Sequence, residues 1–96
     1  MRLSVDARQD MRGVIAFTLE SFGADQATGY ENAFFDAFER IAEFPEVAPA
    51  PNQNAPAERV LLVGSHRIWY RVGDHEIEVA AITHIRSAID PFTPRD

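Results

Sequence analysis

The sequence predicts an α+β protein in which an N-terminal antiparallel helical hairpin packs on a small, mainly antiparallel sheet. Apolar residues recur with helical spacing through the first 44 residues, and short runs of strand-forming residues separated by turn signals follow from residue 59. Residues 45–58 between them are rich in proline, alanine and asparagine and show neither period, which indicates a loop. A chain of 96 residues is long enough for a modest core, so we expect one domain over residues 1–96.

The first 23 residues predict an edge strand followed by a helix. The opening MRLSV is compatible with an edge strand, and Asp6, with Gln9 three residues later, has the pattern of a helix N-cap. Gly23 stands where a left-handed C-terminal cap is expected. The helical spacing rests on Ala7, Met11, Val14, Ile15, Thr18, Leu19 and Phe22.

A second helix is expected from about Asp25 to the residue before Pro45, because proline does not continue a helix. The link around Gly23 is short, so the two helices should lie antiparallel with their apolar stripes facing. The stripe of the second helix is formed by Ala27, Tyr30, Phe34, Ala37, Phe38, Ile41 and Phe44.

Three strands are expected after the loop, RVLLV, HRIWYRV and EIEVAAITHIR, separated by the turn signals GS and GDH. Pairing Val72 with Ile77 across the second turn sets Tyr70 opposite Val79 and gives one apolar face, which should pack on the hairpin. The final residues 87–96 carry two prolines and are expected to form a short helical turn before a frayed or partner-bound end.

The same register predicts an opposite face rich in arginine. It sets Arg71 opposite Glu78, Trp69 opposite Ala80, Arg67 opposite Ile82 and Ser65 opposite His84, with Arg86 beyond, while Ile68 opposite Ala81 belongs to the apolar face. One interpretation is a solvated face with an Arg71–Glu78 pair and a tryptophan covered by arginine stems. The other is a docking surface for a phosphate or an acidic partner segment. The interpretations differ in whether Trp69 is uncovered in the isolated chain.

Composition excludes several classes of protein. There is no cysteine, which excludes disulfides, thiolate metal sites and thiol nucleophiles. The N-terminus lacks the apolar run of a signal peptide, and no stretch is long and apolar enough for a membrane span, so we expect a cytoplasmic protein with no membrane partner. The net charge is -6 and none of the nine basic residues is lysine, which argues against direct nucleic-acid binding by the chain alone.

No residue has the surroundings of a catalytic group or a metal ligand. His84 as a general base would need a partner acid, and Ser65 opposite it lacks a third group to orient the histidine. Asp74, His75 and Glu76 share one turn and would have to converge from adjacent positions to hold a metal. We therefore expect no catalytic residue, no metal and no cofactor.

The chain resembles the ParE/RelE superfamily of toxins from bacterial toxin–antitoxin modules. The resemblance covers nearly the whole chain and is carried by AFERIAEFPEV, by the HRIWYRV strand, and by IEVAAITHIR, where a histidine is followed two residues later by an arginine. RelE-type members are ribosome-dependent mRNA endonucleases with a cluster of lysines and arginines on the sheet, whereas ParE-type members lack that cluster and poison DNA gyrase. The absence of lysine makes this chain look like ParE.

The resemblance implies a non-enzymatic gyrase poison that is neutralised by a ParD-like antitoxin. It also implies an antitoxin-binding surface, for which the candidates are Arg67, Trp69, Arg71, His84 and Arg86, with Trp69 as the central contact. Two alternatives stay open: a RelE-like endonuclease with Arg67, Arg71, His84 and Arg86 as a reduced active site, and a degenerate member that only binds antitoxin.

Overall fold

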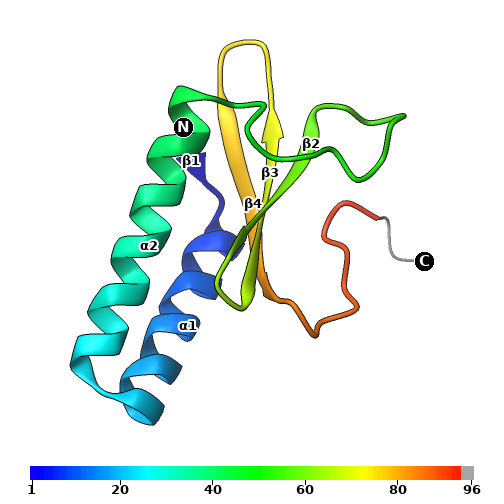
Figure 1. The fold of residues 1–96 in the computed structure, drawn as a ribbon. Coiled ribbons are helices and arrows are strands. Elements are labelled where there is room, and N and C mark those ends of the chain that lie inside the picture. The colour runs from blue at the N-terminus through cyan, green and yellow to red at the C-terminus, as the bar shows by residue number, and fades with distance from the viewer. Residues whose placement is uncertain (94–96) are drawn as a thin grey trace.

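The computed structural model describes residues 1–93 and contains the predicted hairpin and sheet (Figure 1). The two helices lie side by side on one face of the sheet, and the segment after the last strand lies on the other side (Figure 1). The elements in chain order are β1 (Arg2–Leu3), α1 (Val5–Phe22), α2 (Ala24–Glu43), β2 (Glu58–Val63), β3 (His66–Val72) and β4 (Ile77–His84). The predicted fold class is confirmed.

The sheet is mixed, with strand order β1-β4-β3-β2. The strands β2, β3 and β4 form the predicted antiparallel meander, and β1 joins its edge in parallel to β4, with Arg2 opposite Glu78 and Leu3 opposite Val79. Because β1 is so short, side chains of the N-terminal region bind the next part of the β4 edge. Ser4 Oγ donates to the carbonyl of Ala80, and Asp10 accepts the N–H of Ile82 at 2.9 Å.

The N-cap of α1 is Ser4, not the predicted Asp6. The Ser4 side chain accepts the N–H of Ala7 at 3.0 Å. Asp6 is the second residue of the helix, where its negative charge interacts favourably with the positive end of the helix dipole. At the other end the prediction is confirmed. Gly23 has a φ of 93° and donates its N–H to Leu19 at 3.0 Å, and this left-handed conformation favours glycine.

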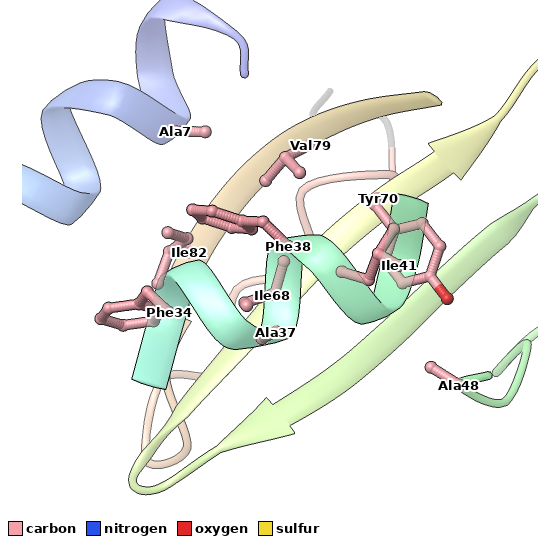
Figure 2. Close-up of a cluster of buried hydrophobic side chains, with 10 residues drawn as sticks. All are labelled: Ala7, Phe34, Ala37, Phe38, Ile41, Ala48, Ile68, Tyr70, Val79 and Ile82. Atoms are coloured by element: carbon pink, nitrogen blue, oxygen red, sulfur yellow. The ribbon is translucent and has the colours of Figure 1, made fainter. Parts of the chain in front are cut away.

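The core lies between α2 and the sheet (Figure 2). Its fully buried large side chains are Phe34, Ile41, Ile68, Tyr70 and Val79. The stripe predicted for α2 is buried as expected, apart from the partly buried Tyr30 and the exposed Phe44 at its end. In α1 only Ala7 is fully buried, and Leu19 and Phe22 are exposed, so the end of the stripe predicted there does not pack.

A β-bulge in β4 changes the predicted register. The pairs of Val72 with Ile77, Arg71 with Glu78 and Tyr70 with Val79 are as predicted, but the register shifts between Trp69 and Tyr70. Beyond the shift the pairs are Trp69 with Ala81, Ile68 with Ile82, Arg67 with Thr83 and His66 with His84. The extra residue, Ala80, lets both Val79 and Ile82 face the helices and enter the core, which the regular register would not allow.

The segment after β4 does not form the predicted helical turn. Residues 87–90 are irregular, and a turn follows at Pro91 and Phe92. The predicted frayed end, residues 94–96, lies outside the described residues. Within residues 1–93 neither helix combines the length and the apolar character that crossing a membrane requires.

Candidate docking surface on the sheet

The sheet face that points away from the helices, called the outer face below, carries three of the five predicted site residues. Arg67, Trp69 and Arg71 alternate along β3 with the helix-facing Ile68 and Tyr70. Their neighbours on the outer face are Glu58, Val60 and Leu62 of β2 and Ala81 and Thr83 of β4.

Trp69 is covered in the isolated chain. The residue is 8% exposed, and its indole donates Nε1–H to the Thr83 hydroxyl at 2.8 Å. The ring of Phe92, from the segment after β4, packs edge to face on it with centroids 5.8 Å apart. The tryptophan is therefore shielded by an aromatic residue of the same chain, and not only by arginine stems as the solvated interpretation assumed.

Both outer-face arginines are engaged within the chain. The Arg71 guanidinium pairs with Glu58 at 3.0 Å and lies 4.8 Å from the centroid of the Phe92 ring. The predicted Arg71–Glu78 ion pair is wrong, because Glu78 pairs with Arg2 on the neighbouring strand. Arg67 donates to the carbonyl of Ile85 at 2.9 Å, so it fastens the residue that follows β4.

His84 lies on the opposite side of the sheet from these arginines, contrary to the predicted register. The bulge turns it toward the helices, opposite His66, and the two rings are perpendicular with centroids 5.1 Å apart. His84 Nδ1 accepts the N–H of Arg86 at 3.0 Å, and the Arg86 side chain is exposed beyond the strand. The sheet thus brings Arg67, Trp69 and Arg71 together and separates them from His84.

A polar cluster that the sequence did not predict lies beside His84. The Tyr30 hydroxyl on α2 accepts the N–H of Ser65 at 3.1 Å, lies 3.0 Å from the carbonyl of Val63 and contacts His66 Nδ1. Burial raises the pKa of the Tyr30 hydroxyl, and the bond from Ser65 partly offsets that rise. Burial, and to a smaller extent the neighbouring His84, lowers the pKa of His66.

This cluster forms one wall of a groove of about 670 Å³ between the hairpin and the β2–β3 turn. The rest of its lining is mostly apolar and includes Gly13, Phe17, Phe22 and Gly29. In the sequence, the residue that could have indicated this cluster is Gly64. It has a φ of 54°, and a Cβ added to it would lie 2.8 Å from the Tyr30 ring. A glycine needed both for its conformation and for close contact marks where the turn meets α2.

The chemistry available on either face is limited. Within residues 1–93, no three acidic or histidine side chains are arranged to hold a metal ion. On the outer face, Arg71 pairs with Glu58, Arg2 pairs with Glu76 and Glu78, and Arg67 donates to a backbone carbonyl. Among residues 1–93, the outer face offers the exposed apolar side chain of Leu62 and the half-exposed guanidinium of Arg71, which suits binding through apolar and charged contacts.

Comparison with known proteins identifies relatives over nearly the whole chain. A family model described as "ParE toxin of type II toxin-antitoxin system, parDE" matches residues 1–89. Toxin ParE1 of Mycobacterium tuberculosis strain H37Rv is 33% identical over 89 residues, which is 92% of this chain and 91% of the relative. Toxin ParE1 of Caulobacter vibrioides is 32% identical over 84 residues, which is 86% of this chain and 85% of the relative.

The fold also matches a solved structure. A chain of the structure described as "Chromosomal ParDE TA system from P. aeruginosa" superposes with a TM-score of 0.73 over 86% of this chain and 91% of that chain. The sequence identity is 16%, so this match supports the fold.

Proposed function

The chain belongs to the ParE family of toxins from type II toxin–antitoxin systems, and from this premise we propose that it binds and poisons DNA gyrase and is neutralised by a ParD-like antitoxin. Gyrase as the target is what the resemblance to ParE-type toxins implies. In this proposal the toxin acts by binding gyrase and catalyses no reaction.

The observation that carries the non-enzymatic proposal is the separation of His84 from Arg67 and Arg71 by the sheet. An endonuclease of the RelE type would need a proton-transferring group and cations around one phosphate, and groups on opposite faces do not converge on one atom. The cations on the outer face are also engaged, Arg71 with Glu58 and Arg67 with the carbonyl of Ile85.

Charge further disfavours the endonuclease. The chain has a net charge of -6 and no lysine, so approach to ribosomal RNA would be electrostatically unfavourable. A degenerate member that only binds antitoxin would share all these features, and it differs from the proposed toxin in having no effect on cells.

Expression in bacteria separates these functions. Induction of the chain alone should stop growth and relax plasmid DNA, and co-expression of its antitoxin should restore both growth and supercoiling. Growth arrest with normal plasmid topology would rule out gyrase as the target. Unaffected growth at a confirmed protein level would favour the degenerate binding module.

We place the antitoxin contact on the outer face around Arg67, Trp69 and Arg71, with the exposed Arg86 beyond the end of β4. His84 is not included, because it faces the helices. Two features support this placement. Leu62 is 64% exposed beside Arg67, and Arg71 keeps about half of its side chain in solvent. An apolar segment carrying acidic side chains would bury the leucine and pair with the arginine.

The placement is tested with Leu62→Ala combined with Arg71→Glu. Because this variant removes an apolar contact and reverses a charge, we expect antitoxin binding to weaken by more than about 2 kcal/mol, measured by calorimetry. Arg40→Glu makes the same charge change at an exposed position in the last turn of α2 and serves as the control. Equal affinity of the double variant and the wild type would place the antitoxin elsewhere.

A further inference from the structure

We propose that the segment after β4, residues 87–93, is an internal cover that closes over the outer face through Phe92 and competes with the antitoxin for that face. The proposal rests on the outer face being the antitoxin contact described above. It adds a regulatory step: the antitoxin must displace the cover before it reaches Trp69.

The contacts of Phe92 identify it as the anchor of the cover. Its ring packs against Trp69 at an angle of 80°, and the Arg71 guanidinium lies over the same ring. Phe92 therefore binds the apolar and the charged part of the outer face at once. An aromatic side chain of an antitoxin segment would make the same two contacts and could not do so while Phe92 is in place.

The remainder of the cover is loosely attached. Within the described chain its hydrogen bonds span no more than three residues. Ser87 N–H donates to the carbonyl of His84 at the end of β4 at 2.9 Å, and the others join Ile89 to Ser87 and both Phe92 and Thr93 to Asp90. Ile89 is 51% exposed. A groove of about 700 Å³ separates residues 89–93 from β4 and the start of α1. A segment held by one aromatic anchor above open space opens more readily than a paired strand.

The anchor lies beyond the part of the chain that the family model matches. That match ends at residue 89, three positions before Phe92. The outer face itself, from β2 to β4, lies within the match. Phe92 therefore lies outside the matched region, although residues 87–89 of the cover lie within it. A closed cover lowers the apparent affinity for any competing partner in proportion to the fraction of time that the cover is open. A cover closed about 90% of the time weakens binding about ten-fold.

The opening of the cover is measurable because Trp69 is the only tryptophan. We expect Phe92→Ala to move tryptophan emission to longer wavelength and to raise the acrylamide quenching constant about two-fold. Phe35→Ala, at an exposed phenylalanine on α2, is the matched control and should leave both unchanged. Phe92→Leu should give intermediate values. Circular dichroism establishes that the variants are folded, and unchanged emission from folded Phe92→Ala would overturn the proposal.

Competition is tested by titrating the full-length wild type and Phe92→Ala with the antitoxin. The cover predicts several-fold tighter binding by Phe92→Ala. Unchanged or weaker binding would overturn the competition, even if the emission shifts. The Leu62→Ala, Arg71→Glu variant keeps the two proposals apart. Loss of binding in that variant together with unchanged affinity of Phe92→Ala rejects the cover alone, and full binding by both rejects the docking surface.

Discussion

His84 and His66 lie opposite each other on β4 and β3, with perpendicular rings 5.1 Å apart on the helix side of the sheet. His66 also contacts the Tyr30 hydroxyl on α2. Burial is the main cause of the lowered pKa of His66, and the proximity of His84 adds to it, because a second positive charge there is unfavourable. Protonation of His66, which lies where α2 contacts the sheet, should therefore destabilise the folded state.

Stability should fall as the pH is lowered from about 7.5 toward 6. The pKa of His66 is lower in the folded state than its ordinary value of 6.5. The unfolded chain thus binds more protons around pH 6.5, and protons favour unfolding. His66→Gln should reduce this dependence, measured as the urea unfolding free energy at pH 6.0, 6.8 and 7.5, values spaced about the ordinary histidine pKa of roughly 6.5.

The control for this prediction is His75→Gln, because His75 is exposed in the turn between β3 and β4. Its replacement should leave the slope with pH as it is in the wild type. A slope that persists in full in His66→Gln would show that other groups cause it.

Substitutions of Ser4 and Asp6 at the start of α1 should destabilise the protein to different extents. Ser4→Ala should cost about 1 to 2 kcal/mol, since it removes the cap on Ala7 and the bond to the Ala80 carbonyl. Asp6→Ala should cost about 0.5 kcal/mol, the size of a charge effect at a helix end. Thermal unfolding of both variants compares the two losses of stability. A larger loss in Asp6→Ala than in Ser4→Ala would contradict the assignment of Ser4 as the N-cap.

Asp10 joins α1 to the edge of β4 through its bond with the Ile82 N–H. Asp10→Ala leaves that partly buried donor unpaired, so we expect a loss of about 1.5 to 3 kcal/mol in chemical denaturation. Asp36→Ala removes the same charge from an exposed position on α2 and should change stability by less than about 0.5 kcal/mol. Similar losses in the two variants would mean that the edge bond does not stabilise the fold.

Local signals in the sequence were sufficient for the hairpin and the meander. The ends of the helices are marked by Gly23 and Pro45, and the ends of the strands by turn residues. The helical and strand periods identify the segments between these ends. The parallel pairing of β1 with β4 depends on contacts between distant residues, and local period carries no signal for it.

The arrangement of the site depends on the bulge at Ala80, and the local sequence pattern of β4 does not predict a bulge at this residue. The bulge there follows from the need to bury both Val79 and Ile82 against the helices. It reverses the side on which His84 lies, so the predicted grouping of His84 with Arg67 was wrong. Phe92 was also missed as a contact of Trp69, because an irregular segment has no period that predicts where it packs.

The most direct test of the central claim is supercoiling by purified gyrase in the presence of the purified protein, beside a translation reaction in which mRNA ends are mapped. We predict loss of supercoiling, accumulation of linear DNA and intact mRNA, with the effect on gyrase suppressed by the antitoxin. Normal supercoiling together with codon-spaced cuts in the mRNA would contradict the account and make the protein an endonuclease.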